Sequence, residues 1–525
     1  MMVSQQQCKT RLFVALLALT LAGSLDGGPA RAEPVGLLAV VRRTLQNDPL
    51  VRIAAKQLEV AEAEAQEASG HFDTALRVSA QSAVDDASVW ADADGNYDTL
   101  VEDSVAFETA LDVPFRSGIT FSPSVRATHT ESDLSEPLNE AEVSFTLRIP
   151  LLRGWGRGSA AAREAAARVD VAAARCRYAH DVAARILATT EAYWGYLAAH
   201  REVTTLESSE KRTATLNGML AALVEAGELA KADLQLIEAY GKTQEAQRIE
   251  AERRLFAARQ ALGLAVGMAP GEAVSLPPPG DAFPDASRLA DADEDSALGL
   301  KEPALRRRAD FLALQHRCTA WDRLAEGARN ASRPGLDAVL GVGYTGWNTD
   351  DGSGQAFTAF GDNAEGATAR LALEFDYPLR NRAALGRYRQ TALRREICRL
   401  ERDDLKRRIG YAIDVDVDAL RALQAELIAL VEAERLYARA FENEREKLQI
   451  GMATPIDLLT AEGQLTGGAL DRIGAQRKHA VAIARLRFDS GMLLEQDTAE
   501  NMTVTEKNLL TVPVPPGDRD EERED

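Results

Sequence analysis

The 525-residue chain is poor in cysteine and in aromatic residues. It holds four cysteines, and aromatic residues make up 6% of it. Cys8 lies before an apolar N-terminal run, and the other three, Cys176, Cys318 and Cys398, are odd in number and far apart. This pattern predicts no disulfide framework, so we interpret these three as buried or half-exposed helix residues. Sparse aromatics also favour long helices packed through small residues over a bulky globular core.

The sequence also lacks long apolar runs and an excess of positive charge. After the N-terminal region no segment holds about twenty consecutive apolar residues, as a transmembrane helix requires. There are 61 Lys and Arg against 81 Asp and Glu, a net charge of −20, which argues against a nucleic-acid partner. The six histidines are dispersed, and no nucleotide-binding fingerprint or catalytic grouping is present. We therefore expect no enzyme activity, no metal site and no cofactor.

The N-terminus has the pattern of a secretory signal. Lys9 and Arg11 precede the apolar run Leu12–Leu25, and the small residues before Ala32 resemble a cleavage site. The run is too short to span a bilayer as a retained helix, although an uncleaved anchor is the alternative. No cysteine follows it at a lipoprotein cleavage site. We predict that residues 1–32 are a signal peptide.

The second half of the sequence repeats the first. Two motifs recur at an offset of 224 residues: Gly227-x5-Asp233-Leu234 as Gly451-x5-Asp457-Leu458, and Leu262-x4-Gly267-Met268 as Leu486-x4-Gly491-Met492. A period of this size is neither that of a solenoid nor that of a propeller. We predict two repeats, residues 33–267 and 301–494. A Pro-rich, acidic linker, 268–300, joins them, and we expect the acidic tail, 495–525, to be disordered.

Each repeat is predicted to contain strands, a proline, a very long helix, a glycine turn and a second long helix. Alternating apolar residues indicate strands near 74–81, 143–149, 334–344 and 369–377, with a further signal at 105–125. The polar stretches 85–104, 129–140 and 346–366 are interpreted as loops. Pro150 and Pro378 close a strand in each repeat, and Gly154 lies in a glycine-rich elbow after the first.

The helices after these prolines are expected to be unusually long. About 65 residues without proline, at about 1.5 Å each, give a helix of roughly 100 Å. Val182, Ile186 and Tyr193 are spaced like a coiled-coil seam, and Ile409, Ile413 and Leu420 repeat that spacing. The offset falls from 228 residues at the prolines to 224 at the glycines. The second hairpin is therefore expected to be about one turn shorter than the first.

Glycine turns are predicted at the tips of both hairpins. Gly227 and Gly451 suit the left-handed position that ends a helix. After Gly451, the residues Thr454, Pro455 and Asp457 form a capping box with proline at the first helical position. The first copy keeps the acid, Asp233, without that cap. Each half should thus hold two long antiparallel helices that meet at a tight tip.

Taken together and in order, these motifs resemble those of the TolC family of outer-membrane channel proteins over residues 37–494. The motifs are Leu45-x-Asn47-x-Pro49, the elbow Ile149–Gly154, Ala192-Tyr193-Trp194, Arg308-x-Asp310 and the paired tips at Gly227 and Gly451. The resemblance implies a mostly helical fold with membrane β-structure. Long coiled-coil hairpins would form a periplasmic barrel, and a homotrimer would share one transmembrane β-barrel in outer-membrane lipid.

The resemblance also implies a function. Family members are exit ducts of tripartite efflux pumps or of type I secretion systems, and they dock a periplasmic adaptor (membrane fusion) protein and an inner-membrane pump or ABC exporter. The strand signal at 105–125 departs from the usual two strands per half. It indicates either an extracellular hairpin or longer barrel strands. The alternative is a periplasmic coiled-coil spacer that forms no channel.

Four acids are candidates for the periplasmic entrance. By resemblance the Asp457 motif lies at the constriction, where three copies of Asp457 and Asp233 would form carboxylate rings that favour cations. A capping role alone is the competing interpretation of Asp457. Glu238 and Glu462 also repeat at an offset of 224, and we favour a solvated helix face for both. The cationic residues that lock the entrance in some members have no clear match at Met452 and Ala453.

Overall fold

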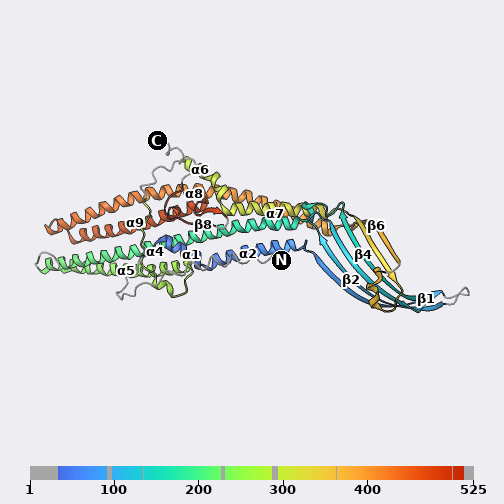
Figure 1. Ribbon diagram of the computed structural model, residues 1–525. Helices are drawn as coiled ribbons and strands as arrows, with labels where there is room; N and C mark the ends of the chain where they lie inside the picture. The colour runs from blue at the N-terminus through green and yellow to red at the C-terminus, as the bar shows by residue number, and fades with distance from the viewer. Residues whose placement is uncertain are drawn as a thin grey trace, which may run out of the picture.

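The computed structural model describes residues 34–90, 97–133, 135–225, 227, 231–285, 294–361, 364–498 and 501–513. The signal peptide predicted at 1–32 lies outside these residues. The molecule is elongated, with a β-sheet at one end and two pairs of long helices that reach the other end (Figure 1). Short elements of both repeats gather around the middle of the helices. This architecture confirms the mostly helical fold class with one region of long strands.

The sheet is an antiparallel meander whose strands lie side by side in chain order, from β1 to β6. The first repeat supplies four strands and the second supplies two: β1 (Ala75–Trp90), β2 (Tyr97–Pro114), β3 (Thr120–Ser132), β4 (Ser135–Pro150), β5 (Gly335–Asn348) and β6 (Ala364–Asp376). β4 pairs with β5, so the two repeats form one continuous sheet. The strand signal at 105–125 therefore belongs to two full members of this sheet.

The strands are longer than the sequence indicates. The stretches 85–104 and 129–140 were predicted as polar loops, but most of their described residues extend β1 to β4, and β1 stays paired with β2 as far as Trp90 and Tyr97. These stretches are rich in polar residues, so they lack the alternation of apolar residues from which strands were predicted. Backbone pairing satisfies the peptide groups there regardless of side-chain polarity. Within 346–366 the described residues hold two short 3₁₀ helices, η3 (Ser353–Phe357) and η4 (Ala359–Gly361), before β6 begins.

A glycine-rich elbow connects β4 to the helices. Pro150 ends β4, and Gly154 follows with φ of +89°. The β2–β3 turn lies directly against this elbow, because a Cβ atom on Gly118 would come within 2.2 Å of the Gly154 carbonyl oxygen. In the second repeat Pro378 follows β6, and Asn381, at φ of +39°, is the N-cap of the next helix. The strand-to-helix junctions thus lie where the prolines predict them.

The helices form a layered bundle around two very long members. The first repeat contributes α1 (Leu37–Asn47), α2 (Pro49–Gly70), α3 (Arg157–Ala160), α4 (Ala162–Glu225) and α5 (Lys231–Val266). The second contributes α6 (Glu294–Arg307), α7 (Ala309–Ala331), α8 (Arg382–Gln449) and α9 (Pro455–Asp489). Near the sheet, α2 packs on α4, α4 on α7 and α7 on α8. Toward the tips, α4 packs on α5 and α9, and α9 on α8. None of the described helices combines the length and the hydropathy that a membrane crossing requires.

The two hairpins are nearly equal in length, which corrects the expectation that the second is a turn shorter. α8 has 68 residues and α4 has 64, to which the short α3 adds four. The extra residues of the first copy lie in the elbow after Pro150, since α8 begins soon after Pro378. The change of the repeat offset from 228 to 224 residues therefore reflects a longer strand-to-helix connection in the first repeat, and the hairpins themselves do not differ in this way.

The predicted seam is the core of the molecule. Val182, Ile186 and Tyr193 on α4 are buried together with Trp194. Ile409, Ile413 and Leu420 on α8 are buried in a second cluster with Ile483 and Leu486 of α9. The repeated spacing thus marks the face by which each long helix packs.

A disulfide bond joins Cys318 of α7 to Cys398 of α8, with the Cα atoms 5.5 Å apart. This corrects the prediction that the cysteines form no disulfide. The two residues are 80 positions apart in the chain, and only the packing of α7 along α8 brings them together. Cys176 is free and half-buried, and burial raises the pKa of its thiol.

The described part of the tail, 495–498 and 501–513, also differs from the expectation of disorder. Residues 495–498 and 501–503 pair as β7 (Glu495–Thr498) and β8 (Asn501–Thr503), and α10 (Glu506–Leu510) follows. Leu509 is buried in the main core beside Leu493. The polar composition of the tail had given no indication that Leu509 would be buried. The first part of the linker is anchored similarly, because Ala273 of its 3₁₀ helix η1 (Glu272–Ser275) and the following Leu276 are buried in the same core.

Candidate functional site at the helical tips

The two glycines predicted to turn the hairpins both adopt the left-handed conformation. Gly227 has φ of +78° and Gly451 has φ of +74°. The amide of Gly451 donates to the Leu448 carbonyl at 3.1 Å, and that of Met452 to Lys447 at 2.8 Å, so the last carbonyls of α8 are satisfied. No described residue comes within 4 Å of a Cβ atom placed on either glycine. Backbone conformation alone therefore requires glycine at the tips.

Thr454 and Asp457 form a reciprocal cap on α9. The Asp457 amide donates to Thr454 Oγ1 at 3.3 Å, and the Thr454 amide donates to Asp457 Oδ2 at 3.0 Å. Pro455 occupies the first helical position, where no amide hydrogen is needed. The hydroxyl of Thr454, followed by its amide, lowers the pKa of Asp457, so this exposed carboxylate is charged at neutral pH. The cap therefore fixes a negative charge at the tip.

The first hairpin presents its acids differently. Asp233 is the third residue of α5, and its side chain lies outside the described part of the chain. Glu238 is exposed on the same helix. A solvated position is therefore right for Glu238.

Glu462, its counterpart in the second hairpin, is fully buried, which corrects the interpretation of a solvated face. Its Oε1 accepts hydrogen bonds from Ser209 Oγ at 2.7 Å, from Arg212 Nη2 at 2.9 Å and from Thr466 Oγ1 at 2.8 Å. Tyr240 donates its hydroxyl to Oε2. Residues of α4, α5 and α9 thus converge on one carboxylate and link the two hairpins within the chain.

This cluster could hardly be predicted from the sequence, because its members lie on three helices far apart in the chain. Burial, followed by the neighbouring Glu462 carboxylate, raises the pKa of Tyr240. The tyrosine therefore remains a neutral donor. A packed apolar cluster, which includes Leu216, Ile237 and Leu458, lies between this carboxylate and the tips. A buried charge held by one arginine and three hydroxyl groups has its hydrogen-bonding capacity well satisfied.

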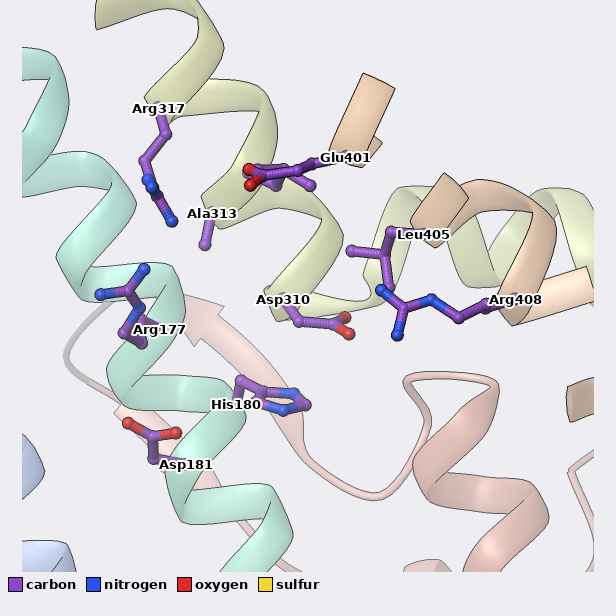
Figure 2. Close-up of a pocket in the computed structure, with 10 residues that line it drawn as sticks. Arg177, His180, Asp181, Asp310, Ala313, Arg317, Glu401, Leu405 and Arg408 are labelled. Atoms are coloured by element: carbon purple, nitrogen blue, oxygen red, sulfur yellow. The ribbon is translucent and has the colours of Figure 1, made fainter. Parts of the chain in front are cut away.

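A second candidate is a cavity of about 450 Å³ between α4, α7 and α8 (Figure 2). Arg177 and His180 of α4 line it, and Figure 2 shows the Asp310 carboxylate and the Arg408 guanidinium pointing toward one another. Arg308 holds Asp310 at 2.8 Å from outside the lining residues. The residues that line this cavity thus carry charges of both signs. They offer no surface of one charge that would favour a cation or an anion. The described residues contain no group of three or more potential metal ligands.

The sheet has two chemically different faces. Directly paired residues share a face, and Phe121, Leu147, Leu340 and Leu371 form one apolar row across β3 to β6. Leu371 is 73% exposed on that face. The opposite face carries ion pairs such as Arg148 with Glu374 at 2.6 Å and with Asp337 at 3.1 Å. One face thus suits an apolar surrounding, and the other suits water.

Solved structures of bacterial outer-membrane proteins, several of them channels, share this arrangement of strands and helices. The Campylobacter jejuni channel CmeC is 15% identical and matches with a TM-score of 0.62 over 92% of each chain. The open-state channel MtrE of Neisseria gonorrhoeae is 14% identical, with a TM-score of 0.60 over 90% of this chain and 95% of that one. The Vibrio cholerae protein VceC is 16% identical, with a TM-score of 0.61 over 87% and 96%.

The chain has the TolC-type channel fold. No protein-family model and no curated protein sequence matches it, so the likeness rests on structure. In this chain the sheet lies at one end, and the tips with Gly451 and Asp457 lie at the other. The predicted family resemblance is thus confirmed at the level of the fold.

Proposed function

We propose that the chain is an outer-membrane channel-tunnel through which a tripartite efflux pump expels its substrates. The observation that carries this proposal is the two-faced sheet, whose apolar face is exposed while ion pairs cover the other. In a channel the apolar face contacts lipid and the charged face lines a watery lumen. The long helices then extend the duct through the periplasm to the tips.

The six strands of the described sheet are too few to close a transmembrane barrel around a lumen, and open edges in lipid leave peptide groups unsatisfied. A homotrimer resolves this, because three copies supply three times as many strands to one closed barrel. The periplasmic tips then dock an adaptor protein and, through it, an inner-membrane pump or ABC exporter. The duct itself is passive, and a type I secretion system is the second assembly that it suits.

Asp457 carries the proposed selectivity of the entrance. Its carboxylate is exposed at the tip and is held charged by Thr454. Three copies around one axis would form a ring that attracts cations and repels anions. Asp233 lies in the first turn of α5, the returning helix of the first hairpin, and is proposed to add to the same ring. Glu238 contributes charge on the exposed surface, whereas Glu462 acts only as an internal link.

Planar-bilayer recording tests the channel and the ring separately. The chain, purified from outer-membrane fractions, should form a heat-modifiable oligomer and should conduct ions. A soluble periplasmic monomer would instead support the spacer.

Asp457→Asn should weaken block by divalent cations because it removes the charge. Thr454→Ala is the matched control, since it weakens the cap and keeps the carboxylate. Equal block in Asp457→Asn and in the wild type would refute the ring.

A further inference from the structure

Three connections at the helix end of the sheet form one hydrogen-bonded unit. After β4, the amide of Gly154 donates to Asn330 Oδ1 at 2.7 Å, near the end of α7. Asn330 Nδ2 in turn donates to the Leu152 carbonyl at 3.4 Å. After β6, Asn381 Nδ2 donates to the Ser332 carbonyl at 2.8 Å. The elbow after β4, the turn between α7 and β5 and the turn between β6 and α8 therefore hold one another in place.

This unit exposes apolar side chains where the apolar face of the sheet ends. The Leu151 amide still donates to the Leu336 carbonyl at 2.7 Å, and Leu151 follows Leu147 by an even number of positions. It therefore extends the apolar face beyond β4. Leu151 and Trp155 are about half exposed, and Leu379, after β6, is 97% exposed. Such a group of exposed apolar side chains marks a surface that meets lipid or a partner.

Four arginines belong to the same connections: Arg157, Arg333, Arg380 and Arg382, which we call the basic rim. All four are exposed, and their side chains form no ion pair or hydrogen bond with any residue that the structure describes. Arg153, in the same elbow, is instead bound to Asp376 at 2.9 Å. The rim thus presents positive charge in a chain whose net charge is −20.

Charge is distributed unequally along the sheet. No lysine or arginine occurs in the ranges 78–115, 127–147 and 334–369, which include the whole half of the sheet far from the helices. Acids such as Asp85, Glu102 and Glu131 lie in that far half. An anionic surface is therefore attracted to the helix end of the sheet and repelled from the far end.

The length of the apolar face supports a membrane boundary at the rim. At the far end the segment between β5 and β6 folds over this face, because a Cβ atom on Gly346 would come within 2.3 Å of the Ala359 carbonyl oxygen. Ala141, which pairs with Gly346, is fully buried. Ala141 and Leu151 are ten positions apart, or about 33 Å along a strand. At the strand tilt of about 40° found in membrane barrels this spans about 25 Å, the height of their apolar band.

We propose that the basic rim binds the phosphate groups of anionic phospholipids, such as phosphatidylglycerol, in the membrane leaflet nearest the helices. The inference rests on the proposed outer-membrane channel and names the lipid that its helix end selects. The guanidinium groups donate to phosphate oxygens, and Leu151, Trp155 and Leu379 contact the adjoining acyl chains. Because the three connections are hydrogen-bonded together, the arginines are held near one another before lipid arrives, which lowers the cost of binding.

Lipid retention tests the rim. The full chain is reconstituted in vesicles of equal parts phosphatidylglycerol and phosphatidylcholine and extracted in mild detergent, and the retained lipid is measured by mass spectrometry. The wild type should enrich phosphatidylglycerol by about fivefold, the factor that one arginine near an anionic surface supplies. Arg157→Gln, Arg333→Gln and Arg380→Gln together should abolish the enrichment. Lysine at the same three positions should keep most of it, because lysine retains the charge.

A matched control carries Arg201→Gln, Arg439→Gln and Arg477→Gln, which change three exposed arginines on the long helices away from the sheet. It has the same net charge as the rim variant and should enrich phosphatidylglycerol as the wild type does. Equal retention of both lipids by the wild type, or full enrichment by the rim variant, would overturn the rim and leave the channel proposal intact. A wild type that inserts into vesicles of neither lipid would instead refute the channel.

Spin labels test the depth of the connections. Leu379→Cys, Leu371→Cys and Met452→Cys are each introduced into the Cys176→Ala chain, in which Cys318 and Cys398 stay joined in the disulfide. The label at 371 should be accessible to oxygen, the label at 452 to a water-soluble nickel reagent, and the label at 379 to both. A label at 379 as accessible to nickel as the label at 452 would overturn the rim. The same accessibility at 371 would refute the channel.

Discussion

The guanidinium of Arg212 lies 2.9 Å from the fully buried carboxylate of Glu462, which ties α4 of the first hairpin to α9 of the second. Tyr240 of α5 closes the same cluster. This link lies within the bundle and does not involve the exposed cap that Thr454 and Asp457 form at the tip. The two acids that the sequence placed together as entrance candidates thus have different surroundings and different roles.

Replacing Glu462 should strongly destabilise the chain. Glu462→Ala leaves the half-buried Arg212 without its charge partner and removes the acceptor of three hydroxyl groups, at a cost of about 3 kcal/mol in the free energy of unfolding. Glu238→Ala, at the repeat-related exposed position, should change it by about 0.5 kcal/mol or less. Denaturant unfolding followed by circular dichroism measures both. Equal effects would mean that water replaces the lost carboxylate.

Gly451 and Gly491 both adopt a positive φ, but replacement by alanine should destabilise the protein to different degrees. At Gly451 the penalty comes from the left-handed backbone alone, about 1–2 kcal/mol. At Gly491, φ is +71°, and a Cβ atom would also lie 2.9 Å from the backbone of Arg307 and Arg308. Gly491→Ala should therefore lower the midpoint of thermal unfolding clearly more than Gly451→Ala. The reverse order would show that the backbone at Arg308 shifts without cost.

Removal of the disulfide should destabilise the packing of α7 on α8. Cys318→Ala with Cys398→Ala frees a loop of 80 residues in the unfolded chain, and the expected loss is about 2–4 kcal/mol. Cys176→Ala is the control and keeps the bond. Reducing agent should lower the unfolding midpoint of the wild type and of this control, but not that of the double variant. An effect of reductant on the double variant would point to another cause.

Asp416 of α8 should make stability depend on pH near neutrality. Burial and then the adjacent Asp489 raise its pKa to about 7, against the smaller opposing effects of Arg485 and Arg308. Because the folded-state pKa is raised, the protonated group stabilises the fold at low pH, and this contribution is lost as pH rises through about 7. Asp416→Asn should thus gain thermal stability relative to the wild type at pH 8 more than at pH 5. A pH-independent difference would contradict the shift.

Much of this fold could be predicted from the sequence because its signals are local. The Gly451 turn, the Thr454 cap and the seam at Ile186 each depend on residues within a few positions of one another. Pro150 likewise marked the end of β4, and Pro378 marked a position just after the end of β6. The polar halves of β1 to β4 escaped detection, because ladder hydrogen bonds and not side-chain polarity hold them.

The sequence by itself determined the duplication, the two long hairpins and the strand-to-helix junctions, since spacing and backbone preference act along the chain. Tertiary structure decided which distant residues meet. Cys318 bonds to Cys398, and Glu462 is buried beside Arg212, because helices far apart in sequence pack side by side. The acidic tail is anchored by Leu509 for the same reason. Burial and pairing are properties of contacts across helices, and these contacts exist only once the bundle has formed.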